Sequence, residues 1–384
     1  YLIMNILLIT PGINEKYNDN YFVYDSIAKK GNKILAISQR EHINKGTGTQ
    51  ISPEFEISGS IIIHRLFNTW KEQKSIISRI LKYPKIRDIL SDFKPDVIIC
   101  EELTNMPLAK KIKGNFNIPI VLRVEFAYNK EYPYRTMAVV LNKFKNKLTK
   151  DYLPILIGES VWNWASKNSD AIISCFFGDA SRKDFNNAPP LHYVPWPTFL
   201  PTNLPRSEKI KERAIFVGAF QKHKNIKELE ITIPLLLNKT PIKEIYIVGM
   251  GEDLNIVENL KAKYPNNIKH MSSLSRIECL GLIRSSFLSY SPATMGGWGF
   301  IGDSFAMKTP IVVTHNHYGF NDGIDSVLTT KNQIVNRIND LYDSEELYNK
   351  ISLGGYTRFI ENHTSEAIGL RFSQICFDTI KNKK

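Results

Sequence analysis

The chain of 384 residues has only four cysteines, which lie far apart at positions 100, 175, 279 and 376. They form no Cys-x-x-Cys pair, and no histidine stands at the spacing of a zinc site. This pattern is typical of a protein in a reducing cytosol, where cysteines stay free. Cys100 closes an apolar strand, so we expect it to be a buried structural thiol.

Long apolar stretches are also absent, since none approaches the roughly 18 to 20 residues that span a bilayer. The chain has no repeat of solenoid period and no low-complexity block. Its 43% apolar and 23% charged residues are normal for a folded protein. The length predicts two domains of roughly 150 to 200 residues each. We expect a cytoplasmic protein, with peripheral contact at the inner face of the membrane as an open alternative.

Acidic residues are scarce relative to basic ones, with 38 Asp and Glu against 50 Lys and Arg and a net charge of +12. Such a surface attracts nucleic acid, acidic lipid headgroups or phosphorylated substrates, or it serves solubility alone. No motif that reads RNA or DNA is present, so nucleic-acid binding would rest on charge only.

Apolar strands alternate with helices in both halves of the chain. This alternation predicts parallel sheets that are covered on both faces. In the first half, we expect strands over 5–9, 33–37, 97–100 and 118–122 and helices over 22–30 and 106–113. In the second half, we expect strands over 215–217, 244–248 and 310–313 and helices over 332–342, 344–353 and 365–380. A proline-spaced, charged stretch over 195–213 is typical of an interdomain connector.

Each strand of the second half runs into a glycine-containing turn. Gly218 and a lysine-bearing loop follow the first, Gly249-Met250-Gly251 follows the second, and Gly297-Trp298-Gly299-Phe300 opens a later helix. Strand, glycine turn and helix in this order gather their loops at one edge of a parallel sheet, where phosphates are usually held. This half is therefore a candidate nucleotide site.

These elements resemble the two-domain GT-B glycosyltransferases, specifically the retaining enzymes of the group 1 or family 4 type. The resemblance covers most of the chain and is strongest over 216–328, where Val217-Gly218 with Lys224, the Gly-x-Gly turn, the glycine-aromatic-glycine turn and Asp303 occupy the family's places. It implies two Rossmann-like doubly wound domains that face a cleft. Residues 1–196 would form the acceptor-binding domain, 197–213 the linker and 214–364 the nucleotide-sugar donor domain, and the helix in 365–384 would cross back to the N-terminal domain.

The sequence departs from the family pattern at several positions. Met295 stands where the family has the first of two acidic residues, and the second is Asp303 where glutamate is usual. Ala219 replaces an arginine, and the N-terminal glycine-rich loop is replaced by residues 11–14. Glu125 takes the place of the family's histidine.

The resemblance implies Glu125 and Asp303 as catalytic residues, with Asp303 also holding the ribose hydroxyls. Glu125 as a surface carboxylate, Asp303 as a residue that only favours the helix dipole, and Trp298 as a core residue remain open. Lys222 and Lys224 would neutralise the diphosphate, unless they only form a solvated loop. The implied donor-binding residues are Gly218, Lys222, Lys224, Gly249, Gly251, Met271, Gly297, Trp298, Gly299, Phe300, Asp303 and Ser304.

No Asp-x-Asp motif stands where a metal would need one, so we expect metal-independent transfer of a hexose-type sugar, with a nucleotide-diphosphate sugar as co-substrate and no cofactor. The acceptor would be a glycan, a lipid-linked molecule or a protein. A catalytically silent GT-B scaffold that binds nucleotide sugar or a partner, and a GT-B transferase of another family, remain alternatives.

A lysine-rich segment over 141–150 carries an apolar pair on a cationic surface. On a helix, Lys143, Phe144, Lys147 and Lys150 would suit an anionic membrane. An ordinary solvated helix over the sheet is the alternative.

Overall fold

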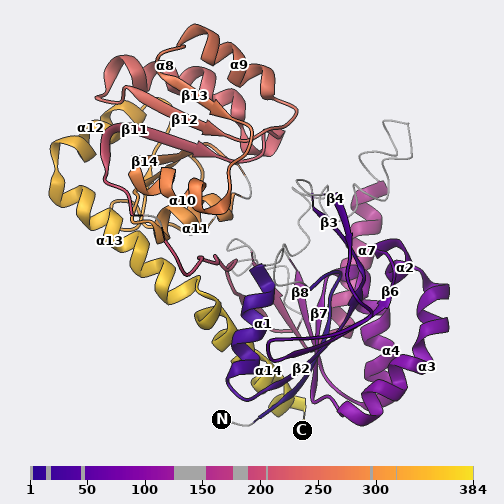
Figure 1. The fold of residues 1–384 in the computed structure, drawn as a ribbon. Coiled ribbons are helices and arrows are strands. Elements are labelled where there is room, and N and C mark those ends of the chain that lie inside the picture. Colours follow the sequence, from indigo (N-terminus) through magenta and orange to yellow (C-terminus); the bar gives the residue numbers. More distant parts are fainter. Residues whose placement is uncertain are drawn as a thin grey trace. The chain divides into compact units, whose positions relative to one another are not determined.

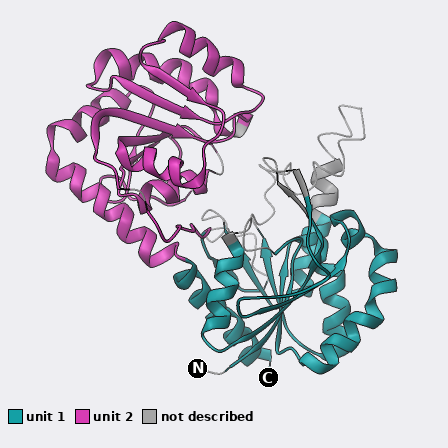
Figure 2. Cartoon of the chain, in the orientation of Figure 1, with its two compact units in different colours: residues 1–195, 365–384 teal, residues 196–364 magenta. Residues whose placement is uncertain are grey.

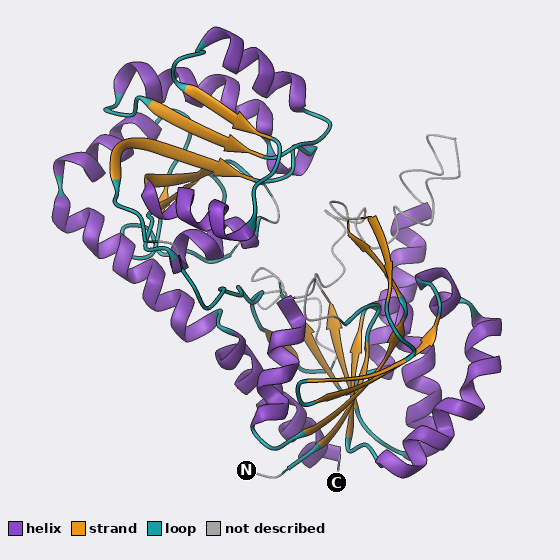
Figure 3. Cartoon of the chain, in the orientation of Figure 1, coloured by secondary structure: helices purple, strands orange, loops and turns teal. Residues whose placement is uncertain are grey.

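The computed structural model describes residues 3–13, 19–44, 48–124, 153–175, 189–204, 206–294, 297–316 and 318–383. The chain divides into two compact units, of which unit 1 comprises residues 1–195 and 365–384 and unit 2 comprises residues 196–364 (Figure 2). Each unit is built on its own sheet with helices on both faces (Figure 3).

Unit 1 contains a sheet of eight strands in the order β10-β9-β8-β7-β1-β2-β6-β5. All pairs are parallel except β5 with β6. The strand order reverses direction at β1, which pairs with β2 on one side and with β7 on the other. The strands are β1 (Asn5–Ile9), β2 (Lys33–Gln39), β5 (Phe55–Ser58), β6 (Ile61–Phe67), β7 (Val97–Glu101), β8 (Ile120–Val124), β9 (Ala171–Ser174) and β10 (Leu191–Tyr193), and β3 (Glu41–Asn44) forms a separate hairpin with β4 (Gly48–Ile51).

Helices cover both faces of this sheet because its central strands are apolar on both sides. One core cluster joins the sheet to α3 (Ile76–Phe93), α4 (Met106–Phe116) and α7 (Leu153–Asn168). The other joins it to α1 (Asp19–Lys29) and α14 (Ser365–Lys383). The short helix α2 (Trp70–Lys74) precedes α3 directly (Figure 1).

Unit 2 contains six parallel strands in the order β13-β12-β11-β14-β15-β16. The order reverses direction at β11, which pairs with β12 on one side and β14 on the other. The strands are β11 (Ile210–Val217), β12 (Glu244–Val248), β13 (Ile268–Met271), β14 (Ser286–Ser291), β15 (Ile311–Val313) and β16 (Val327–Leu328).

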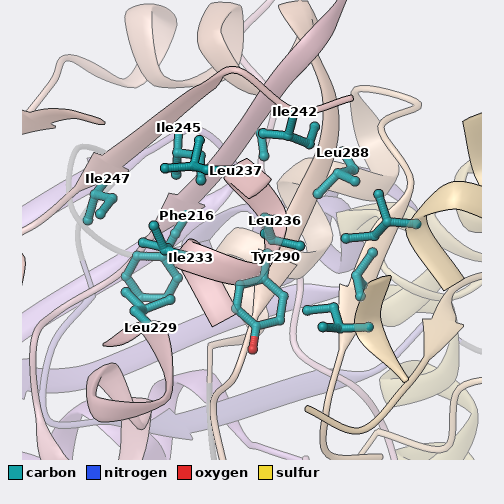
Figure 4. Close-up of a cluster of buried hydrophobic side chains, with 14 of the residues drawn as sticks. Phe216, Leu229, Ile233, Leu236, Leu237, Ile242, Ile245, Ile247, Leu288 and Tyr290 are labelled. Atoms are coloured by element: carbon teal, nitrogen blue, oxygen red, sulfur yellow. The ribbon is translucent and has the colours of Figure 1, made fainter. Parts of the chain in front are cut away.

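Alternate residues of β11 point to the two cores of unit 2. Ala214 and Phe216 pack against α8 (Leu229–Lys239), in a cluster that also takes in α9 (Leu254–Lys263) and α12 (Ile334–Asp343) (Figure 4). Ile215 packs on the other side, with α10 (Arg276–Ser285) and α11 (Trp298–Ala306). The long helix α13 (Glu345–Asn362) contributes Ile351 to the first cluster and Phe359 to the second.

The last helix, α14, packs on α1 in unit 1. Ile368, Phe372, Ile375 and Cys376 are buried there, and the rings of Tyr24 and Phe372 meet edge to face at 6.1 Å. The predicted fold class, with two doubly wound sheets and a C-terminal helix that returns to the N-terminal unit, is confirmed.

Two boundaries differ from the sequence prediction. β11 begins at Ile210, so residues 210–213 of the expected linker are strand. Arg213 of this stretch pairs with a distant residue, since its Nε lies 2.6 Å from Glu244 Oε2 on β12. The helix expected over 344–353 continues to Asn362 as α13.

Candidate functional site

Unit 2 has a pocket of about 570 Å³ at the carboxyl end of its sheet. Phe216, Val217 and Gly218 line it at the end of β11, and Ser291 and Ala293 line it at the end of β14. β11 and β14 are neighbours in the sheet, and the strand order changes direction between them. In open α/β sheets, ligands bind in the crevice at this switch point.

Two glycines hold the loop after β11 against the loop after β12. A Cβ at Gly249 would lie 1.9 Å from Gly218 O, and a Cβ at Gly251 would lie 2.3 Å from Phe220 O. The backbones are joined by hydrogen bonds from Gly218 N to Val248 O (3.0 Å) and from Phe220 N to Met250 O (2.8 Å). These glycines therefore support the lysine-bearing loop by close backbone contact.

Lys224 brings a cation to the pocket beside the start of α11. It ends a 3₁₀ turn (Lys222–Lys224) and lines the pocket. Its Nζ lies 3.6 Å from the position that a Cβ at Gly297 would take. Gly297 caps α11 with a φ of 90°, a conformation that favours glycine. Gly297, Gly299 and Phe300 at the start of α11 line the pocket, and the first N–H groups of a helix have no partner within the helix. An ammonium group and a helix N-terminus together suit a phosphate.

Asp303 forms a bidentate ion pair with Arg276 at the pocket wall. Arg276 Nη1 donates to Asp303 Oδ2, and Nη2 donates to Asp303 Oδ1 at 2.5 Å and to Phe199 O at 2.9 Å. The Asp303 side chain is 6% exposed and that of Arg276 is 44% exposed. The capping box of Ser275 and Glu278 fixes the start of α10 and thereby the place of Arg276.

Cys279 also lines the pocket, one turn after Arg276 on α10. Burial and the nearby Asp303 carboxylate raise the pKa of its thiol to about 11, against the opposing effect of Arg276. The thiol is therefore protonated at neutral pH.

The pocket brings together six of the residues that the resemblance implied: Gly218, Lys224, Gly297, Gly299, Phe300 and Asp303. Other implied residues lie elsewhere in unit 2. Lys222 is exposed, and Met271 ends β13. Ser304 is buried and donates to Phe300 O at 2.8 Å.

Trp298 is a core residue of unit 2. Its ring stacks on that of His363 at 3.8 Å, and its Nε1 donates to Thr198 Oγ1 at 3.0 Å. It is buried in the cluster around α11 and is not among the residues that line the pocket. The alternative interpretation of Trp298 from the sequence, packing in the core, matches this position.

The sequence prediction missed several lining residues, of which Arg276 matters most. The signal that could have located it is the Ser-x-x-Glu capping pattern at Ser275 and Glu278, which marks a helix start directly after the strand that ends at Met271. The other lining residues that were not among the predicted site residues are Phe216, Val217, Ala219, Leu274, Cys279, Ser291 and Ala293.

A buried polar network lies at the carboxyl edge of the sheet in unit 1. Glu101, at the end of β7, accepts hydrogen bonds from Thr10 Oγ1 at 2.5 Å, from Tyr24 OH at 2.6 Å and from Arg123 Nη1. Burial acts to lower the pKa of Arg123, but Cys175 and Glu101 outweigh it and raise that pKa above its ordinary value. The network fixes the end of β8, two residues before the implied catalytic residue Glu125.

Some expectations fall outside the described residues. These are Glu125, Met295 and the lysine-rich segment with Lys143, Phe144, Lys147 and Lys150. Within the described part of the chain, no three His, Cys, Asp or Glu side chains are grouped as metal ligands would be. No helix among the described residues has the length and apolar character to cross a bilayer.

The structure is similar to solved glycosyltransferases over nearly its whole length. Sucrose-phosphate synthase from Thermosynechococcus elongatus matches with a TM-score of 0.67 at 14% identity, over 98% of this chain and 99% of that chain. HepE from Anabaena in complex with UDP matches with a TM-score of 0.63 at 12% identity, over 98% of this chain and 100% of that chain. A glycosyltransferase from Rickettsia africae matches with a TM-score of 0.65 at 12% identity, over the full length of both chains.

The chain has the GT-B fold. This confirms the fold that the family resemblance implied. No protein-family model matches the sequence, and no curated protein matches it.

Proposed function

We propose that this GT-B protein is a retaining glycosyltransferase that moves a hexose-type sugar from a nucleotide-diphosphate sugar to a glycan, a lipid-linked molecule or a protein. The observation that carries the proposal is the pocket at the switch point of unit 2. Lys224, the N-terminus of α11 and the Arg276–Asp303 pair all line this pocket. A cation and a helix N-terminus bind a diphosphate, and a carboxylate accepts hydrogen bonds from ribose hydroxyls. The diphosphate and the ribose of a nucleoside diphosphate thus each have a partner in the pocket.

The proposed donor is a UDP sugar. HepE, which has a similar structure, was solved with UDP and with UDP-glucose. The pocket of about 570 Å³ has the size of a small-molecule site. Lys224 and the N–H groups at the start of α11 would neutralise the leaving diphosphate without a metal ion.

In the proposed reaction, the acceptor hydroxyl oxygen bonds to the anomeric carbon on the face that the leaving group departs from. The bond between the anomeric carbon and the diphosphate oxygen breaks, and that phosphate takes the acceptor proton. The products are the glycosylated acceptor and a nucleoside diphosphate. Glu125, which follows the Arg123 network, is proposed to contact the acceptor or the donor sugar.

A thermal-shift panel of UDP, GDP, ADP and their common sugars, with magnesium and with a chelator, tests the donor site. We expect UDP compounds to stabilise the wild type without metal, by about 2.7 kcal/mol at roughly 100 times the dissociation constant. Lys224→Ala should weaken binding by about tenfold or more, because it removes a charge-assisted contact to phosphate. Lys227→Ala is the matched control, since Lys227 is exposed three residues away and does not line the pocket.

Release of UDP from UDP-glucose, with and without candidate acceptors, tests turnover. Binding that depends on Lys224 but produces no UDP release would instead support the silent scaffold. No shift with any nucleotide would overturn the donor site itself.

A further inference from the structure

Unit 1 exposes several large apolar residues on α2 and α3. The side chains of Ile76, Ile77, Ile80 and Leu81 are 70%, 70%, 57% and 73% exposed, and that of Trp70 is 38% exposed. Ile76 and Ile80, and likewise Ile77 and Leu81, are four residues apart on α3, so their side chains are neighbours. We call these five residues, with Lys71, Lys74, Lys82 and Lys85 around them, the α2–α3 surface. Isolated exposed apolar residues are ordinary, but a grouped set marks an interaction site.

The opposite face of the same helices is firmly held, so the outward direction of the apolar side chains is fixed. Arg79 is buried and donates from Nε to Gln73 O at 2.6 Å and from Nη2 to Thr104 O. Gln73 is buried and donates to Thr10 O at 3.0 Å. Farther along α3, Tyr83 and Ile86 are buried in the core. Rotating α3 to hide its outer apolar face would break all of these contacts.

The two helices that present the apolar side chains are rich in positive charge. Residues 70–87 contain six basic residues and one acidic residue, Glu72. Arg79 is the only buried one of the six, and Lys85 pairs with Glu54. Lys74 Nζ lies 3.0 Å from the ring centroid of Trp70, which keeps the ammonium group at the edge of the apolar area. A cationic rim around apolar side chains complements an anionic lipid surface.

The same charge disfavours another occupant, a second copy of the chain. A twofold contact through this surface would bring Lys71, Lys82 and their neighbours against the same lysines of the other copy. Like charges across a buried contact are repulsive. An anionic bilayer meets both the apolar and the charged part of the surface.

The surface lies at the carboxyl edge of the sheet in unit 1. Trp70 begins α2 three residues after the last residue of β6, Phe67, and Gln73 and Arg79 bond to loops that follow β1 and β7. Figure 1 shows α2 and the start of α3 beside the end of β6. Ligands of open α/β sheets bind at this edge.

We propose that the α2–α3 surface docks unit 1 on an anionic lipid bilayer. The apolar side chains enter the boundary between headgroups and acyl chains, and the lysines contact lipid phosphates. The residues of this surface are different from those of the lysine-rich segment 141–150 that the sequence singled out. Among the three acceptor classes it favours the lipid-linked one, a step that rests on the proposed function.

Vesicle co-sedimentation of the full chain tests the docking. We expect binding to phosphatidylcholine vesicles that contain phosphatidylglycerol, weaker binding to phosphatidylcholine alone, and a loss of binding as salt rises. The double variant Ile77→Ser, Leu81→Ser should lower the partition coefficient at least about tenfold. Its matched control is Leu353→Ser, Ile360→Ser on α13, which removes two apolar side chains that are 59% and 46% exposed in unit 2.

The proposal would be overturned if both double variants lost vesicle binding equally, or if the α2–α3 variant kept the vesicle binding of the wild type. The proposal would also be overturned if the wild type did not bind vesicles and light scattering showed that it forms a dimer which the α2–α3 variant does not form. Thermal shifts with UDP should be the same in both variants, so failure of the membrane surface can be told apart from failure of the donor site.

Discussion

At the scale of single residues, Asp303 is the most constrained group of the pocket. Its carboxylate is nearly buried and both its oxygens are bonded to Arg276. A ribose that hydrogen-bonds Asp303 would share the carboxylate with Arg276 or displace it. Arg276, at 44% exposure, is a second cation in a pocket that has Ala219 where the family carries arginine.

Cys279 provides a reporter of the pocket. Because the pKa of its thiol is raised to about 11, the reactive thiolate is a small fraction at neutral pH. As long as the pH is below that pKa, each unit of increase in pH raises the thiolate fraction about tenfold. We expect the rate of maleimide labelling of the native protein to rise about tenfold per pH unit between about pH 7 and pH 9. The labelled residue should be Cys279. The other three cysteines are buried, and burial raises the pKa of the Cys376 thiol to about 12.

UDP should slow the labelling of Cys279 if it fills the pocket. Peptide mass mapping with and without UDP measures this protection, and Cys279→Ser is the control for labelling elsewhere. Labelling that UDP leaves unchanged would contradict the assignment of this pocket to the nucleotide.

At the scale of elements, the glycine turns have two different duties. Gly249→Ala places a Cβ 1.9 Å from a backbone oxygen, so we expect it to lower the free energy of unfolding by more than about 2 kcal/mol. Gly299→Ala meets no atom within 4 Å and lies inside α11, so stability should hold or rise by up to about 1 kcal/mol. Because Gly299 lines the pocket, the same change should weaken UDP binding.

Urea unfolding and UDP titration of the two variants separate these duties. A Gly299→Ala protein that binds UDP like the wild type would show that no ligand approaches this part of α11. An undisturbed Gly249→Ala protein would show that the two loops can separate at little cost.

The ends of β7 and β8 depend on the ion pair of Glu101 and Arg123. Both side chains are 7% exposed, so Glu101→Ala leaves a buried arginine without its carboxylate, and we expect a loss of about 3–5 kcal/mol in the free energy of unfolding. Glu54→Ala removes the partner of Lys85 in an exposed pair and should cost within about 1 kcal/mol. Similar urea midpoints for the two variants would contradict a structural role for the buried pair.

At the scale of the whole molecule, each unit has its own core. The clusters of unit 1 and unit 2 share no residue, and α14 completes the core of unit 1 although it follows unit 2 in the sequence. We therefore expect calorimetry to resolve two unfolding transitions, because chains with separate cores depart from two-state unfolding.

Matched substitutions assign the transitions. Ile368→Ala in α14 should lower only the transition of unit 1, and Ile338→Ala in α12 only that of unit 2, each by about 2–5 kcal/mol. UDP should raise the transition that Ile338→Ala lowers. A single transition that both variants and UDP shift equally would contradict independent cores.

The sequence by itself determined the doubly wound sheets and the glycine turns at the carboxyl edge of the sheet in unit 2, whereas the return of the last helix to unit 1 was implied by the family resemblance. The sheets and turns follow from local patterns, because apolar strands, glycine turns and helix starts are encoded by neighbouring residues, and parallel strands bring their carboxyl ends to one edge. Gly218, Lys224, Gly297 and Asp303 could be found in this way because each stands next to such a turn or helix start.

Only the tertiary structure decided which side chains meet and which faces are covered. Arg276 pairs with Asp303 across 27 positions of sequence, and Trp298 stacks on His363 from a distant helix. Ile77 and Leu81 of α3 are exposed although they are apolar, because contacts of Gln73 and Arg79 with distant loops fix the inner face of the two helices. Such choices depend on packing between elements, which local periodicity does not specify.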